Sequence, residues 1–288
     1  MQKGISLHIG INQVDATHYK KSETEGWDGA LKGCEADALV MEAIANQQGF
    51  ETNLLLTQQA TRIAVLQAIE NAAKMLEAGD YFLITYSGHG GQVLDISKDE
   101  RKDNDLLGGK KDIKDETWCL YDAQLLDDEL QRLWAAFKKD VCILLFSDSC
   151  HSGTVVRDFF NPLPVPPQGM MDRTAPKDSF DFTYIFHKQL YDKLQGPKEN
   201  RPKIVAQVIS FAACQDQQLS REDQSKENPG GLFTKSVQKI WTSKNFSNYK
   251  SFFEAIEKDM TTLVQTPKYL AIGSNVSSFE EQPPFDLS

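Results

Sequence analysis

Short, almost wholly apolar runs separated by amphipathic stretches constrain the fold of this chain more than any other feature. Tyr81–Tyr86 (YFLITY) and Val141–Phe146 (VCILLF) are the clearest examples. Runs of this length and character predict strands that are buried on both faces. The predicted strands are Ile5–Ile11, Thr52–Leu56, Thr117–Tyr121 (short), Tyr81–Tyr86, Val141–Phe146, Gln207–Ala212 and Tyr269–Ile272.

Apolar residues recur at helical spacing between these runs, and Gly49 and Gly79 close the first two helical patterns. The alternation of strands and helices predicts an α/β fold in which helices cover both faces of a mostly parallel sheet. The predicted helices are Ala30–Gln48, Thr61–Ala78, Asp127–Lys138, Leu232–Trp241 and Tyr249–Leu263.

Two stretches interrupt this alternation. Gln92–Lys114 is dense in Asp, Lys and Gly, which predicts a long surface loop. The Pro-rich segment 159–202 predicts an extended insert with a helical turn or two in Tyr184–Leu194. The insert divides the chain into a larger part, 1–158, and a smaller part, 203–288.

Composition excludes several classes of protein. The 31 basic and 41 acidic residues give a formal charge of −10, which argues against binding to nucleic acid or to anionic lipid. No apolar run approaches the roughly 20 residues of a membrane span. The start Met1-Gln2-Lys3 leads almost directly into a strand, so we expect no signal peptide and a cytoplasmic protein. Five cysteines without regular spacing indicate free thiols.

Polar residues with glycines follow two of the predicted strands, where ligands bind in parallel sheets. One loop is Ser87-Gly88-His89-Gly90-Gly91 and the other is Ser147-Asp148-Ser149-Cys150-His151-Ser152-Gly153. We expect His89 and Cys150 to form a catalytic dyad. A thiolate is a nucleophile, and a nearby imidazole lowers the thiol pKa and later protonates a leaving amine. The backbone N–H groups of Gly90 and Cys150 are the predicted oxyanion hole.

The remaining cysteines and His151 have simpler interpretations. Cys119, Cys142 and Cys214 are expected to be buried small hydrophobic residues. His151 directly follows Cys150, so its side chain is expected to point away from the thiol. No Cys-x-x-Cys or His-Glu-x-x-His pattern occurs, which argues against a zinc site.

At these loops the chain resembles the metacaspases and bacterial orthocaspases, which are caspase-like cysteine peptidases. The dyad residues stand 61 positions apart in Tyr86–Gly91 and Asp148–Gly153. The cysteine context, Asp-Ser-Cys-His-Ser-Gly, is unlike the Gln-Ala-Cys-x-Gly of true caspases. Weaker matching segments are Leu31–Ala38, Leu126–Leu130, Ser210–Asp216, Gly231–Thr234 and Gln265–Pro267.

The resemblance implies the caspase–haemoglobinase fold, a three-layer sandwich with about six strands, as one compact unit over residues 1–288. It also implies endopeptidase activity with Arg or Lys before the scissile bond. By position, the pocket for that basic side chain would comprise Cys34, Asp37, Ser87 and Asp148. A buried carboxylate at Asp148 favours a cationic partner, and a guanidinium offers it two donors. The alternatives are a helix-surface charge for Asp37 and a loop cap for Asp148.

Calcium is required by many relatives, and Asp122, Asp127 and Asp128 match part of their acidic cluster. A further family ligand position is Arg157 here, and a cation would repel the metal, although Asp158 lies next to it. Acids at 127–129 also suit a helix N-terminus. We therefore expect no cofactor and calcium-independent activity, with a weak calcium site as the alternative.

The favoured function is an Arg- or Lys-directed cysteine endopeptidase that acts on proteins or peptides as a monomer. Cleavage after Asp, as in true caspases, is disfavoured by the acidic pocket. A catalytically silent scaffold or regulatory module is the alternative from another class. Self-cleavage is expected after a basic residue in an exposed segment. The candidate residues are Lys110, Lys111, Arg157, Arg173, Lys177, Lys188 and Lys193.

Overall fold

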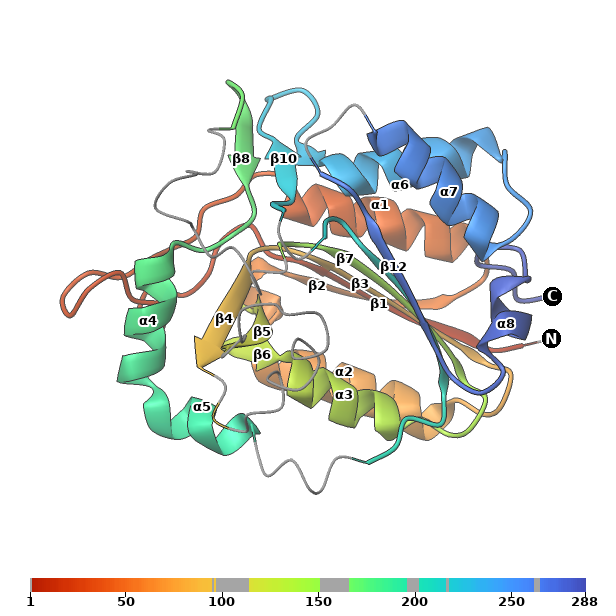
Figure 1. Cartoon of the computed structure of the whole chain (residues 1–288), viewed down its shortest axis with the longest axis horizontal. Helices are drawn as coiled ribbons and strands as arrows, with labels where there is room; N and C mark the ends of the chain where they lie inside the picture. The colour runs from red at the N-terminus through yellow and green to blue at the C-terminus, as the bar shows by residue number, and fades with distance from the viewer. Residues whose placement is uncertain are drawn as a thin grey trace, which may run out of the picture.

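The computed structural model describes residues 2–94, 96, 114–150, 166–195, 202–215, 218–261 and 265–288. Its centre is a six-stranded sheet (Figure 1). Neighbouring strands are parallel except for β9 and β12, which are antiparallel. The mostly parallel sheet is thus confirmed. In spatial order the strands are β12 (Lys268–Ile272), β9 (Gln207–Ala212), β7 (Cys142–Asp148), β3 (Tyr81–Ser87), β1 (Gly4–Gly10) and β2 (Glu51–Leu56).

Helices cover both faces of this sheet, which confirms the three-layer α/β architecture (Figure 1). Alternate residues of β3 explain why the strand is apolar throughout. Phe82 and Ile84 join the cluster under α2 and α3, whereas Tyr81 and Leu83 join the cluster under α1, α6 and α7. The helices are α1 (Cys34–Gln47), α6 (Leu232–Ser243), α7 (Tyr249–Met260) and α8 (Val276–Glu280) on one side, and α2 (Arg62–Met75) and α3 (Asp127–Ala135) on the other.

Strands from both predicted parts of the chain join this one sheet, because β7 of the first part pairs with β9 of the second. Two three-stranded sheets lie outside it. They comprise β4 (Gly90–Leu94), β5 (Lys114–Cys119) and β6 (Gln124–Leu126), and β8 (Met170–Asp172), β10 (Arg221–Asp223) and β11 (Gly230–Gly231); a short 3-10 helix, η1, spans Thr57–Gln59.

The prediction of a largely extended insert is wrong for its described part, whereas the helical turn or two predicted in Tyr184–Leu194 is confirmed. Residues 170–195 form β8 and two helices, α4 (Lys177–Phe186) and α5 (Lys188–Gln195). Pro176 immediately precedes α4, where proline is compatible with a helix start because no N–H partner is needed there. Phe180 and Tyr191 are buried, so packing stabilises both helices.

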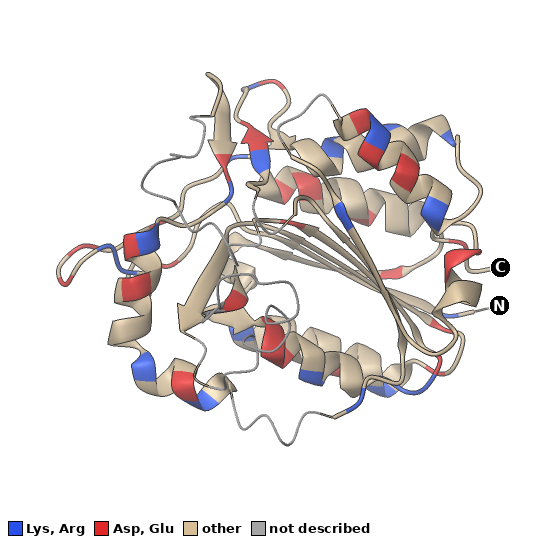
Figure 2. Ribbon diagram, viewed as in Figure 1, with Lys and Arg blue, Asp and Glu red and all other residues tan. Residues whose placement is uncertain are grey.

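Charged side chains lie mainly on helices and loops, whereas the central strands carry few (Figure 2). This distribution follows from burial of the strands between two apolar clusters. Among the described residues, every helix is too short or too polar to cross a bilayer.

Candidate active site

The carboxyl ends of β3 and β7 lie side by side, as predicted for the two glycine-containing loops. The parallel register pairs Ser87 of β3 directly with Asp148 of β7. His89 and Cys150 each follow two residues later, so the sheet itself brings the two loops to one edge. A Cβ atom on Gly90 would lie 1.7 Å from the carbonyl oxygen of Cys150. Only glycine permits this approach of the loops.

The His89 ring is held on one side of the site by the segment before α1. Its Nε2 lies 3.1 Å from the carbonyl oxygen of Gly29, and its ring centroid lies 4.9 Å from that of Trp27. A carbonyl oxygen only accepts, so Nε2 carries the proton and Nδ1 has the free lone pair. Nδ1 is buried and has no hydrogen-bond partner among the described groups.

The backbone at His89 is fixed by the residues around it. Its carbonyl oxygen accepts hydrogen bonds from the Tyr86 hydroxyl at 2.7 Å and from the Cys119 N–H at 3.0 Å. The Tyr86 ring stacks on Trp118 with centroids 4.5 Å apart. The imidazole is therefore presented by a rigid turn.

The Cys150 thiol is 2% exposed and contacts the backbone of Ser220. The Ser220 N–H donates to Cys150 Sγ at 3.0 Å. Burial, together with the neighbouring Cys214 thiol, raises the pKa of Cys150 well above its usual value. Burial lowers the pKa of His89 to about 3. At neutral pH the two groups are consequently a thiol and a neutral imidazole.

The backbone of Arg173, in the insert, occupies the predicted oxyanion hole. Its carbonyl oxygen accepts hydrogen bonds from the N–H groups of Gly90 at 3.1 Å and Cys150 at 3.4 Å. Its own N–H donates to the Ser220 carbonyl oxygen at 2.9 Å. The Arg173 peptide group thus contacts the two predicted oxyanion donors and lies against the cysteine-bearing loop.

The Arg173 side chain fills the predicted basic pocket and is fully buried. One guanidinium nitrogen, Nη1, lies 2.9 Å from Ser87 Oγ and 3.1 Å from Asp148 Oδ1. The other, Nη2, lies 2.6 Å from Asp37 Oδ2 and 3.3 Å from Glu222 Oε2. The structure therefore brings Asp37, Ser87 and Asp148 together around one guanidinium.

The two aspartates are also tied to neighbouring elements. Asp148 Oδ2 accepts from the N–H and hydroxyl of Thr234 in the first turn of α6, so this carboxylate also has a capping role. Asp37 accepts from the Gly231 N–H at 3.0 Å. It is 3% exposed, so the interpretation as a helix-surface charge is wrong.

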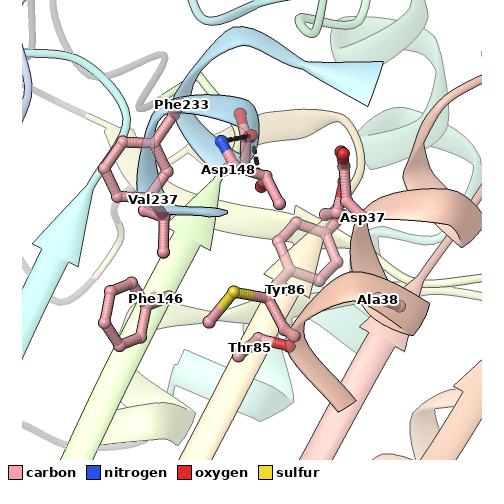
Figure 3. A pocket seen from close by; sticks show the side chains of 11 residues that line it. Asp37, Ala38, Thr85, Tyr86, Phe146, Asp148, Phe233 and Val237 are labelled. Carbon is pink, nitrogen blue, oxygen red and sulfur yellow. Dashed lines mark hydrogen bonds between the residues drawn. The ribbon is translucent and has the colours of Figure 1, made fainter. Parts of the chain in front are cut away.

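The pocket holds three buried carboxylates around one cation. Burial raises the pKa of Asp37 to about 6; Arg173 opposes this rise and Asp148 adds to it. Figure 3 shows Asp37 and Asp148 beside a small cavity whose other walls include Phe146, Phe233 and Val237. The apolar surroundings keep the carboxylates away from water, which strengthens their attraction for a cation.

Cys34 lies beside Glu222, one of the three carboxylates around Arg173. Its thiol lies 3.9 Å from Glu222 Oε2. Glu222 also accepts hydrogen bonds from the N–H groups of Lys32 at 2.9 Å and Gly33 at 3.2 Å. Glu222 therefore joins β10 to the start of α1 and adds a third carboxylate.

All three cysteines that were predicted to be buried are buried. Cys119 and Cys142 are buried in the two apolar clusters, as expected. Cys214 is buried as well, but its thiol neighbours that of Cys150 rather than a cluster. His151 lies outside the described residues, so its orientation stays a prediction.

The acidic residues considered for calcium do not assemble into a metal site in the described part of the chain. Asp122 Oδ1 accepts from the Arg62 N–H at the start of α2, at 2.7 Å. Asp127 begins α3 and accepts from the Asp128 N–H at 2.8 Å, which confirms the helix N-terminus. No group of three or more His, Cys, Asp or Glu in the described ranges could hold a metal ion. Arg157 and Asp158 lie outside these ranges.

Several residues of the site carry no sequence signal that we identified. Gly29, Ser220 and Glu222 contribute through loops or a three-residue strand that no pattern singles out. Arg173 was one of several candidates for self-cleavage, not an expected pocket ligand. Among the other candidates, Lys110, Lys111 and Arg157 lie outside the described residues.

Comparisons with known proteins agree with this geometry. A family model described as the caspase domain matches residues 3–283. Over 162 residues, covering 52% of this chain, the chain is 30% identical to Metacaspase-1 of Ajellomyces capsulatus and to Metacaspase-1A of Aspergillus fumigatus. The match covers 41% and 35% of those proteins, so it spans well under half of each relative.

A solved structure is similar over almost the whole length. The crystal structure of protein GSU0716 from Geobacter sulfurreducens is 39% identical, with a TM-score of 0.82 and 99% of both chains covered. The family match extends over residues 3–283, and the structural similarity extends over almost the whole chain. This chain belongs to the caspase-domain family and is similar to metacaspases.

Proposed function

We propose that this chain is a cysteine endopeptidase that cleaves peptide bonds after arginine, with Cys150 as nucleophile and His89 as general acid and base. The observation that carries the proposal is Arg173. Its guanidinium is held by carboxylates while its carbonyl oxygen accepts from the Gly90 and Cys150 N–H groups. Arg173 is thus an arginine of the chain itself that is bound as a substrate arginine would be. This binding supports arginine specificity.

The proposed reaction begins with transfer of the Cys150 thiol proton to Nδ1 of His89. The thiolate then bonds to the carbonyl carbon of the arginine, and the carbonyl π electrons move to an oxyanion stabilised by Gly90 and Cys150. Collapse of this intermediate breaks the C–N bond, and His89 gives its proton to the leaving nitrogen. Water, deprotonated by His89, attacks the thioester and releases a carboxylic acid and the Cys150 thiol.

The neutral dyad suits this sequence of steps. A thiol and an imidazole with a free Nδ1 lone pair have one proton to exchange, and the Gly29 carbonyl oxygen keeps the second imidazole proton on Nε2. Charge separation is needed only when substrate attack begins. Stabilisation of the developing oxyanion then acts in a site from which water is largely excluded.

The first substrate proposed is the chain itself, at the Arg173–Thr174 bond. As long as Arg173 fills the pocket, no other arginine can enter it, so the uncut chain is self-inhibited. Cleavage gives fragments that end at Arg173 and begin at Thr174. Release of residues 170–173 from the site would then admit substrates in trans.

Alternative specificities are less well supported. An Asp side chain would be repelled by Asp37, Asp148 and Glu222. Lysine would fit as a weaker ligand, because one ammonium cannot engage acceptors on both sides as two guanidinium nitrogens do. The silent-module alternative is less well supported, because His89 and Cys150 follow neighbouring strands and the N–H groups of Gly90 and Cys150 share one acceptor.

The test compares wild-type protein with Cys150→Ala and Arg173→Gln by intact mass and N-terminal sequencing over time. We expect a new N-terminus at Thr174 in the wild type only. Cys142→Ala, which removes a thiol from the opposite end of β7, is the matched control and should cut normally. A peptide panel varied only before the scissile bond should show cleavage after Arg, weaker cleavage after Lys, and none with Cys150→Ala.

Each outcome separates the parts of the proposal. Cleavage of Arg peptides by a protein that never cuts at Arg173 would overturn self-processing alone. No turnover of any peptide would favour the silent module. We further propose activity without calcium by a monomer; strict dependence in a calcium titration would contradict the first point.

A further inference from the structure

The residues immediately before Arg173 are bound as an added strand. Met170–Asp172 forms β8, which pairs antiparallel with β10 in the register Asp172 to Arg221, Met171 to Glu222 and Met170 to Asp223. The bond from the Arg173 N–H to Ser220 continues this ladder to the candidate nucleophile. Extended peptides bind sheet edges in this manner, with specificity from alternate side chains. β10 is therefore the edge on which a substrate would lie (Figure 1).

An ion pair links the residue before Arg173 to this edge. Arg221 Nε lies 2.9 Å from Asp172 Oδ1, and the two side chains are 6% and 18% exposed. Charge-assisted hydrogen bonds at such low exposure are stronger than those at the surface. Asp172 belongs to the bound segment, whereas Arg221 belongs to the site.

Arg221 is held independently of the segment that it contacts. Its N–H donates to Gln265 Oε1 at 3.0 Å, and Gln265 Nε2 in turn donates to the Ala213 carbonyl oxygen at 3.1 Å. Gln265 is 2% exposed, and Ala213 directly follows β9 of the central sheet. The β10 backbone at Arg221 would thus stay anchored if residues 170–173 left.

We propose that Arg221 forms a second specificity site, which selects an acidic residue immediately before the arginine of the substrate. The inference rests on the proposed function and narrows its substrate class to proteins with Asp-Arg or Glu-Arg at the cleavage point. The pocket for the substrate arginine is acidic, whereas the neighbouring site at Arg221 is basic. A substrate with a second basic residue immediately before the arginine is therefore rejected. Figure 2 shows charged residues of both signs on and beside β8 and β10.

The turnover test uses self-cleaved wild-type protein and peptides that differ only before the arginine: Asp, Asn, Ala or Lys. We expect kcat/KM for the Asp peptide to exceed that for the Asn peptide by about 30-fold, because Asp forms a buried ion pair with Arg221. The Lys peptide should be the poorest substrate, because its charge repels Arg221. Arg221→Gln should abolish the difference between Asp and Asn. Arg221→Glu should reverse the order of Asp and Lys.

A binding measurement separates this inference from the proposed function. Cys150→Ala/Arg173→Ala protein is titrated with fluorescent Met-Met-Asp-Arg amide and its Lys-Arg analogue, and the anisotropy is recorded. Preference for the Asp peptide without turnover in the wild type would support the second site while overturning the proposed activity. Equal kcat/KM or equal affinity for the Asp and Lys peptides would overturn the second site, whether or not arginine is required.

Discussion

The two halves of the candidate site differ in how the chain holds them. One half, with Ser87, Asp148 and the two loops, stands at the ends of strands in the buried six-stranded sheet. The other half, with Arg173 and Glu222, stands on or beside strands of three residues in a separate three-stranded sheet. Under the proposed function, the half on the central sheet is a fixed reaction centre and the shorter segment stands where a substrate would bind.

Charged side chains make several of the contacts between the halves. Three carboxylates and one guanidinium meet where the halves join, all of them buried. Removing one member of such a cluster leaves buried charges without partners. Exchanging the arginine-bearing segment for another peptide with an arginine would restore the ion pairs. Under the proposed function, inhibition by Arg173 and recognition of substrate use the same contacts.

Removing the Arg173 guanidinium should disrupt the contact between the two halves more than any other change. In the Cys150→Ala background, which keeps the chain whole, Arg173→Met should lower the free energy of unfolding by about 3 kcal/mol, because buried carboxylates lose their partner. Urea is the denaturant of choice, since guanidinium chloride would itself fill the pocket.

The control is Lys177→Met, which removes a cation from an exposed pair with Asp181 and should change stability by under about 0.5 kcal/mol. If Arg173→Met lowers the free energy of unfolding by less than about 1 kcal/mol, the second half detaches at little cost and water hydrates the carboxylates.

Asp148→Asn acts on the fixed half and should lower kcat/KM for Arg peptides by about 100-fold, the cost of losing a buried charge-assisted bond. An asparagine oxygen can still accept from Thr234, so α6 should stay in place. Steady-state kinetics with Arg and Lys peptides check this, and Asp181→Asn is the matched surface control. Loss of helical circular dichroism with Asp148→Asn would instead indicate a structural role.

The fixed half was predictable because its signals are local. Val141–Phe146 predicts a buried strand, and the residues after it, including Asp148 and Cys150, follow from where that strand ends. The same holds for His89 after Tyr81–Tyr86. Parallel pairing then brings both loops to one edge without further information.

The second half was not predictable because its contacts join distant residues through irregular segments. Glu222 reaches Nη2 of Arg173 and the backbone of Lys32, positions 49 and 190 residues away. The prolines around Arg173 favour extended chain, but burial of Phe180 and Tyr191 stabilises helices α4 and α5 directly after it. Tertiary packing overrode local propensity there.

The charge of Asp37 allows a milder test of how the pocket takes a guanidinium. In Cys150→Ala/Arg173→Ala protein, agmatine should bind through its guanidinium, and its affinity should fall as the pH is lowered towards 6. With the pocket occupied, the pKa of Asp37 is about 6; without a guanidinium it is higher, so binding expels a proton. The expected slope is at most tenfold per pH unit, levelling off below about 6.

Isothermal titration at several pH values measures this slope. Asp37→Asn should bind more weakly at neutral pH and show a flatter profile, because the titrating carboxyl is gone. A pH-independent affinity in the parent protein would contradict a proton-linked Asp37.

Glu222→Gln changes the second half and should have a smaller effect than the other variants. Nη2 of Arg173 is approached by both Asp37 and Glu222, and a lysine nitrogen cannot reach both sides of the pocket. The ratio of kcat/KM for Arg over Lys peptides should therefore fall about fivefold, mainly through weaker Arg cleavage. Glutamine keeps one oxygen for the N–H groups of Lys32 and Gly33, so the start of α1 should remain attached. Equal losses of kcat/KM for the Arg and Lys peptides would mean that Glu222 only holds the start of α1 in place. The guanidinium would then be recognised by the first half alone.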